Sequence, residues 1–130
     1  MSIDQIEYVL DHYKSPRNYG RLSEPDVSCE EGNPICGDVV RIDLKIEDNK
    51  VAESRFTGKG CAISKASASI LTEMIIDKDL EYIKSLSPDD MINALGMRIS
   101  PIRLRCALLS LKVIRSALFG IKGWPGEEGK

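Results

Sequence analysis

The sequence has 130 residues, of which 42% are hydrophobic, so it can bury one apolar core but is too short for two ordinary domains. Its 18 basic and 20 acidic residues are spread along the chain and give a formal net charge of -2, which leaves no basic footprint for nucleic acid. The apolar runs fall short of the roughly 18 residues of a membrane span, and the amino end lacks the pattern of a cleaved leader. We therefore expect a soluble, cytoplasmic protein without nucleic-acid or membrane partners.

The first third of the chain predicts one helix, one short strand and a loop. Apolar residues recur at helical spacing over residues 3–13, which indicates an amphipathic helix. A short strand is expected at 27–29. The stretch that follows, 30–38, is rich in turn residues, so we expect Cys36 and Asp38 to lie on a loop.

A hairpin and a glycine pair come next. Apolar and polar residues alternate over 40–57 and are interrupted by the turn sequence at 48–50, which predicts two strands with one buried face. Gly58 and Gly60 allow a tight or left-handed backbone directly before Cys61. A helical pattern begins after that cysteine, so Cys61 is expected at the start of a helix.

The remaining chain is predicted to be helical. Helical patterns cover residues 62–75 and 80–86, and Ser87-Pro88-Asp89-Asp90 is a good opening for a further helix that Gly96 closes. Pro101 is expected to open the last long helix, in which Cys106 shares a sector with apolar residues and faces shielded space.

These elements favour an α+β domain, because the strands come first and most helices follow, without alternating βαβ units. We expect one domain over residues 1–122. The Gly- and acid-rich segment 123–130 is predicted to be a flexible tail.

The four cysteines do not suggest a disulfide framework, because the chain has enough apolar residues for a core. Cys36, Cys61 and Cys106 are expected on a loop, at a helix start and in the first turns of another helix. Their separations do not match a zinc finger or a ferredoxin motif, so a common site would have to be assembled by tertiary structure. Spacing alone leaves this open, since an intracellular cysteine is more often a small buried hydrophobe.

The surroundings of these residues favour a metal site. Cys61 would benefit from the positive end of a helix dipole and from Lys59 and Lys65, which favour a thiolate. Asp38 follows Cys36 by two residues and offers a hard oxygen ligand beside a soft sulfur ligand. Such a mixed site would hold iron less firmly than four thiolates, which suits a cluster that is built and then released.

Four sequence strings, taken together and in this order, resemble the IscU/SufU/NifU-type iron-sulfur cluster scaffold proteins. The resemblance runs over nearly the whole chain, and several strings at compatible separations are specific. The strings are DHYKSPRN at 11–18, NPICGD at 33–38, GKGCAISKASAS at 58–69 and RLRC at 103–106.

The resemblance implies a small antiparallel three-stranded sheet packed with about five helices. It implies a [2Fe-2S] cluster, or zinc in the cluster-free state, bound by Cys36, Asp38, Cys61 and Cys106. The implied partners are a cysteine desulfurase, which delivers persulfide sulfur with Cys106 as the favoured acceptor, and apo iron-sulfur acceptor or carrier proteins; which cysteine receives sulfur first stays open, and a homodimer is compatible with this. The implied function is that of a scaffold for de novo cluster assembly rather than an enzyme.

The chain also departs from the family pattern. Ile99-Ser100-Pro101-Ile102-Arg103 replaces the Leu-Pro-Pro-Val-Lys motif of many members, which argues against recognition by a dedicated Hsp70 chaperone. Arg105 replaces a histidine found before the third cysteine, and arginine cannot ligate a metal because it stays protonated. The insertion typical of zinc-dependent SufU carriers is missing between Cys61 and Cys106, although the sequence after Cys61 is more SufU-like than IscU-like.

Three functions therefore compete. The scaffold is preferred, and the alternative is a zinc-dependent persulfide sulfurtransferase or carrier. A structural zinc domain is disfavoured because such sites usually use four Cys or His ligands.

For the other notable residues, the sequence predicts packing roles or leaves the role open. His12, the only histidine, is expected to serve helix packing, and Cys29 is expected to pack on a strand face. Lys59 and Lys65 are either solvated charges or a positive rim around the thiolates. Arg103 lies one turn before Cys106 and is hypothesised to favour its thiolate.

Overall fold

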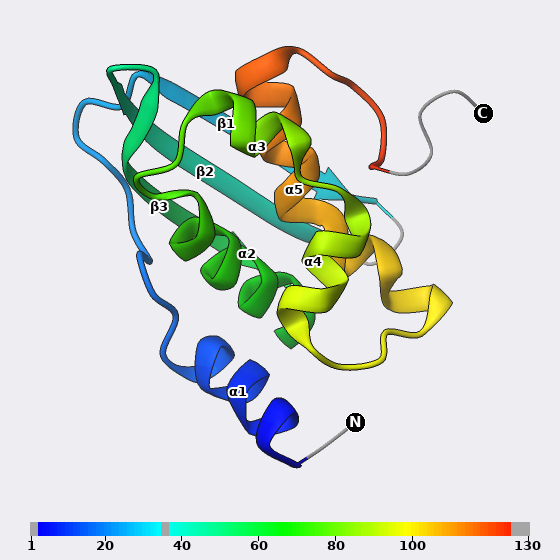
Figure 1. The fold of residues 1–130 in the computed structure, drawn as a ribbon. Helices are drawn as coiled ribbons and strands as arrows, with labels where there is room; N and C mark the ends of the chain where they lie inside the picture. The colour runs from blue at the N-terminus through cyan, green and yellow to red at the C-terminus, as the bar shows by residue number, and fades with distance from the viewer. Residues whose placement is uncertain (1–2, 35–36, 126–130) are drawn as a thin grey trace.

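The computed structural model describes residues 3–34 and 37–125, and Figure 1 shows their arrangement. The described residues form five α-helices, one short 3₁₀ helix and a three-stranded antiparallel sheet, so the predicted α+β class and sheet are confirmed. In chain order the elements are α1 (Ile3–Lys14), β1 (Val27–Asn33), β2 (Asp38–Glu47), β3 (Lys50–Lys59), α2 (Ala62–Ile75), α3 (Leu80–Ser85), α4 (Pro88–Leu95), η1 (Pro101–Arg103) and α5 (Leu104–Phe119).

The sheet has the order β1-β2-β3, with β2 in the centre. The predicted hairpin is β2 and β3, joined through Asp48 and Asn49, whose φ angles are 52° and 63°. Two-residue hairpin turns with positive φ match the twist of the strands, and Asp and Asn tolerate that conformation best after glycine. The turn and a one-residue shift in the pairing between Lys45 and Ile46 together set the register that brings Asp38 and Lys59 to the same end of the sheet.

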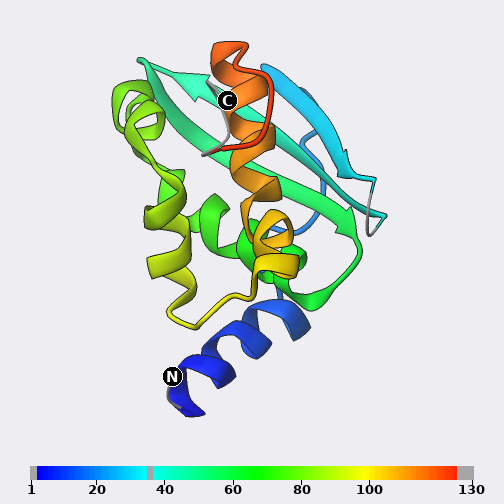
Figure 2. The same cartoon turned by 90° about the vertical axis from the view of Figure 1, so that its right-hand side faces the viewer.

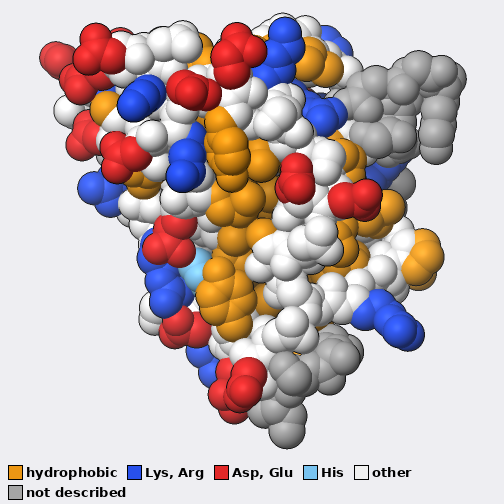
Figure 3. Space-filling model, viewed as in Figure 1, with side chains coloured by type: hydrophobic (Ala, Val, Ile, Leu, Met, Phe, Trp, Pro, Cys, Tyr) orange, Lys and Arg blue, Asp and Glu red, His pale blue; other side chains and the backbone are white. Residues whose placement is uncertain are grey.

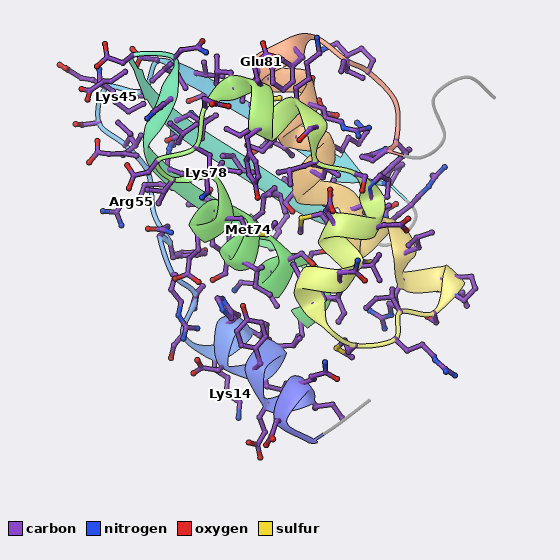
Figure 4. All side chains as sticks on the ribbon, viewed as in Figure 1. Lys14, Lys45, Arg55, Met74, Lys78 and Glu81 are labelled. Carbon is purple, nitrogen blue, oxygen red and sulfur yellow. The ribbon has the colours of Figure 1, made fainter. Side chains whose placement is uncertain are left out.

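One face of the sheet is covered by α2 and α5, which Figure 2 shows from the side. Apolar residues of the strands, among them Val40, Leu44 and Phe56, join apolar residues of both helices in the main buried cluster. Met74, labelled in Figure 4, lies on α2 and packs against this cluster and against a smaller one that includes Val9 of α1. This apolar packing holds α2 and α5 against the sheet.

The DHYKSPRN string ties α1 to α2. His12 is 1% exposed, and its Nδ1 lies 2.7 Å from Oγ of Ser69 on α2. The same Oγ accepts a hydrogen bond of 2.8 Å from the backbone N–H of Arg17. His12 thus serves helix packing, as predicted, and this string has a structural role.

Two predicted boundaries were wrong. β1 extends to Asn33, and Asp38 begins β2 instead of lying on a loop, because the pair Asn33–Asp38 continues the ladder between the two strands. The backbone hydrogen bonds of the ladder outweigh the turn preferences of this stretch. Cys36 lies outside the described residues.

The second correction concerns the last helix. Pro101 opens a 3₁₀ turn, and α5 begins only at Leu104. The N–H of Arg103 donates to the carbonyl of Ser100 three residues earlier, so the tighter turn uses backbone groups that an α-helical start would leave unpaired. By contrast, the predicted α4 is confirmed, with a capping box between Ser87 and Asp90.

The domain boundary at residue 122 stays a prediction. Within 123–125, Trp124 packs against the main cluster, and the centre of its ring lies 4.9 Å from the guanidinium carbon of Arg105 and 5.4 Å from Nζ of Lys112. Across the described ranges, no helix combines the length and the apolar character that crossing a membrane requires. On the face drawn in Figure 3, acidic and basic side chains are interspersed.

Candidate metal centre

Three predicted ligands meet at one end of the sheet. Asp38 is the first residue of β2, Cys61 is the N-cap of α2, and Cys106 lies in the first turn of α5. Their candidate ligand atoms, a carboxylate oxygen and two sulfurs, all lie within 4.8 Å of one another. Three elements distant in sequence thus create a site that no local motif encodes.

Asp38 is held from two sides. Its side chain is buried, with the residue 2% exposed. The backbone N–H of Cys61 donates to Oδ1 at 3.0 Å, and the hydroxyl of Ser64 donates to Oδ2 at 2.5 Å. Both donors belong to the first turn of α2, so the positive end of that helix faces the carboxylate.

Gly60 allows this close approach. Its φ is +135°, a conformation that side chains disfavour. A Cβ at this position would lie 2.9 Å from Cα of Asp38 and closer still to its carboxylate. Gly58 is similarly constrained, since a Cβ there would lie 2.8 Å from the carbonyl oxygen of Val39. The glycine pair therefore lets the β3–α2 connection close on the start of β2.

The donor set and its spacing fit a metal ion. Two ligands of one tetrahedral zinc, at about 2.3 Å for sulfur and about 2.0 Å for oxygen, lie roughly 3.5 Å apart. The distance between Sγ of Cys61 and Oδ2 of Asp38 is 3.4 Å. Two thiolates and one carboxylate suit zinc or iron and leave a fourth position open for a further ligand.

Arg103 supplies the positive charge beside these groups. Its hydrogen bond to Cys61 and the charge of that cysteine, followed by the charge of Cys106, raise the pKa of its guanidinium. The stronger connection is therefore with Cys61, whereas the sequence hypothesis paired Arg103 with Cys106. Lys65 points elsewhere, because its Nζ lies 5.7 and 5.5 Å from the ring centres of Tyr13 and Tyr19.

Cys29 packs against the apolar cluster, whereas Ser64 contacts the candidate ligand Asp38. Cys29 is half-buried and packs against the main apolar cluster, which agrees with the predicted packing role. Ser64 lies in the string at 58–69, and the sequence alone assigns it no function. Its position offered a signal, since it stands three residues after the N-cap Cys61, where a polar side chain can turn back to the helix start.

The fold and the site together define a class of small α+β domains that bring cysteines and a carboxylate together at one candidate metal position. A family profile described as NifU-like N terminal domain matches residues 4–127. The chain belongs to this family.

Individual relatives cover most of the chain. The zinc-dependent sulfurtransferase SufU of Bacillus subtilis is 37% identical, over 95% of this chain and 90% of that protein. The iron-sulfur cluster assembly scaffold protein IscU of Haemophilus influenzae is 32% identical, over 92% of this chain and 97% of that protein. The crystal structure of SufU from Fervidobacterium islandicum AW-1 has a TM-score of 0.74 at 29% identity, and covers 85% of this chain and 93% of that one.

Proposed function

We propose that this chain is a scaffold on which an iron-sulfur cluster is assembled and from which the cluster passes to apo acceptor proteins. The observation that carries the proposal is the convergence of Asp38, Cys61 and Cys106, whose ligand atoms lie within 4.8 Å of one another. Its family membership supports the same function, because relatives are named iron-sulfur cluster assembly scaffolds. Cys36, two residues before Asp38 in the sequence, is the fourth ligand in this proposal.

The cargo that we propose is a [2Fe-2S] cluster. Three thiolates and one carboxylate bind iron less strongly than the four thiolates typical of electron-transfer clusters. A carrier that must release its cargo benefits from this weaker ligand set. The protein turns over no substrate of its own in this scheme.

Sulfur is proposed to come from a cysteine desulfurase as a persulfide. The thiolate of Cys106 attacks the outer sulfur, a new S–S bond forms, and the original S–S bond breaks with its electron pair leaving on the desulfurase cysteine. Reduction of this sulfur to sulfide then takes two electrons from an external dithiol, which is oxidised to its disulfide while Cys106 returns to the thiolate. Because Cys106 is 1% exposed, neighbouring side chains must move before a persulfide reaches its Sγ.

The second candidate is a zinc-dependent persulfide sulfurtransferase. It is favoured by the 37% identity to the Bacillus protein that bears this name. That alignment spans 140 positions and is longer than this chain, so the Bacillus protein has positions without a counterpart here. This difference accords with the missing insertion and favours the scaffold.

Anaerobic reconstitution distinguishes the two functions. The protein is incubated with ferrous iron, cysteine, a cysteine desulfurase and dithiothreitol as reductant, and absorption spectra are recorded with iron and sulfide analysis. A scaffold should form a cluster that transfers to an apo-ferredoxin. Tight retention of zinc without any cluster would overturn the scaffold and promote the sulfurtransferase.

Two cysteine variants provide a matched comparison. Cys61→Ser should abolish cluster formation, whereas Cys29→Ser should retain it, because Cys29 packs away from the site. Alkylation of the sulfur-loaded protein followed by mass mapping of its peptides identifies the cysteine that receives the persulfide. If the alkylated persulfide is found on Cys61 or Cys36 instead of Cys106, the proposed sulfur route is wrong, while the proposed ligand set is unaffected.

A further inference from the structure

Ser64 is the one hydroxyl in contact with a candidate ligand among the hydrogen bonds found in the described ranges. It is 0% exposed, lies in the first turn of α2 and donates to Oδ2 of Asp38 at 2.5 Å. Its Oγ is also 3.7 Å from Sγ of Cys61. This hydroxyl is buried between a carboxylate and a thiol at the edge of the candidate metal centre. Helix formation alone does not require a hydroxyl there.

The two carboxylate oxygens of Asp38 have different partners. Oδ1 accepts from the backbone N–H of Cys61, while Oδ2 lies 3.4 Å from Sγ of Cys61. Since that distance suits two ligands of one metal, Oδ2 is the oxygen that faces the metal position. Ser64 donates to this same oxygen and not to the one that the backbone holds.

We infer that Ser64 is a positioning residue for the metal centre, which fixes the carboxylate of Asp38 so that Oδ2 faces the two sulfurs. The inference rests on the proposed function, since it concerns the same site. Without the hydroxyl, Oδ1 would remain tied to the helix start, but Oδ2 would lose its shortest described hydrogen bond, so the carboxylate would be held less firmly in this orientation. Partners of metal ligands typically contribute about 10- to 100-fold to metal affinity when they orient a ligand in this way.

Helix α2 contains a matched control. Ser67 is also 0% exposed, one turn further along, and its hydroxyl has no hydrogen-bond partner among the residues that the structure describes. Ser64→Ala and Ser67→Ala therefore remove the same atom from the same buried helix. Alanine is the better helix former, so both variants should fold.

The test is a Co²⁺ titration of the full chain, read from the ligand-field bands of the bound ion. Ser64→Ala should weaken Co²⁺ binding by about tenfold or more and change the band intensities, whereas Ser67→Ala should stay within about twofold of the unmodified protein. In an Asp38→Ala background, Ser64→Ala should change affinity by less than about twofold, because the hydroxyl acts mainly through its 2.5 Å hydrogen bond to the carboxylate.

The outcomes separate this inference from the proposed function. Unchanged affinity in Ser64→Ala, while the unmodified protein binds Co²⁺, would overturn the inference and leave the site intact. An equal loss in the Asp38→Ala background would overturn it as well, because Ser64 would then act through Cys61 or through helix packing. Absence of Co²⁺ binding to the unmodified protein would overturn the metal centre itself, and the role of Ser64 with it.

Discussion

Replacing Gly60 by alanine should damage the metal centre through Asp38, although Gly60 carries no ligand. The added Cβ would lie 2.9 Å from Cα of Asp38 and nearer still to its carboxylate. Asp38 begins a paired strand and is 2% exposed, so it cannot swing into solvent. Either the carboxylate or the first turn of α2 must therefore shift, and the hydrogen bonds that join them must lengthen or break.

The magnitude follows from a comparison with Gly20. Both glycines have nearly the same φ angle, +135° at Gly60 and +132° at Gly20, but a Cβ at Gly20 would have no described atom within 4 Å. Backbone strain of about 1–3 kcal/mol is thus common to both alanine variants. Loss of the two hydrogen bonds to Asp38, each about 1.5 kcal/mol for a charged acceptor, should make Gly60→Ala less stable than Gly20→Ala by about 2–3 kcal/mol.

Two measurements check this reasoning. Urea unfolding of the metal-free variants gives the difference in free energy of unfolding, and Co²⁺ titration gives the metal affinity. Gly20→Ala should keep the affinity of the unmodified protein, while Gly60→Ala should lose at least about tenfold. Equal stability losses together with equal affinities would refute the claim that the close approach to Asp38 requires glycine.

Three further outcomes are expected. Asp38→Ala should slow release of an assembled cluster to an apo-ferredoxin, because the hard oxygen ligand is the weak one; faster loss would contradict this. Arg103→Ala should slow alkylation of Cys61 by iodoacetamide more than alkylation of Cys106, since its hydrogen bond is to Cys61; equal effects, measured by peptide mass mapping, would count against that pairing. Burial, followed by the charge of Arg17, lowers the pKa of His12 below 6.5, so the unfolded chain binds this proton more readily. The free energy of unfolding should be intact above pH 6.5 and fall as the pH decreases from there towards the pKa of the folded state, and His12→Gln should flatten this dependence.

Much of the fold could be predicted because its signals are local. Alternation over 40–57 reported the hairpin, and Ser87 with Gly96 marked the ends of α4. The errors arose where pairing with distant residues decides the structure. Residues 30–33 of the turn-rich stretch become strand because their backbone pairs with residues 38–41 of β2, which a reading of neighbours in sequence does not detect.

The residue types of the site could be predicted from the sequence, but the contacts between their side chains could not. Cysteines near glycines and at a helix start drew attention to Cys61, but the spacing between cysteines could not reveal that their side chains meet. Lys65 illustrates the limit, because its sequence position suggested a charge near Cys61, whereas its ammonium group lies over Tyr13 and Tyr19. Long flexible side chains choose partners in three dimensions, and only the folded chain decides among them.

The way Asp38 is held restricts how this site can release a metal. A ligand can be weak because it is mobile or because its chemistry binds the metal poorly. Asp38 is buried and receives hydrogen bonds at both oxygens, which excludes a freely moving carboxylate. In the proposed site, its weakness would therefore come from the chemistry of a hard oxygen among thiolates, with Ser64 drawing electron density from the oxygen that faces the metal. Ser64 thus both orients this ligand and limits the strength of its bond to the metal. When Ser64 is removed, the affinity lost because the carboxylate is held less firmly should exceed the affinity gained from a stronger metal–oxygen bond.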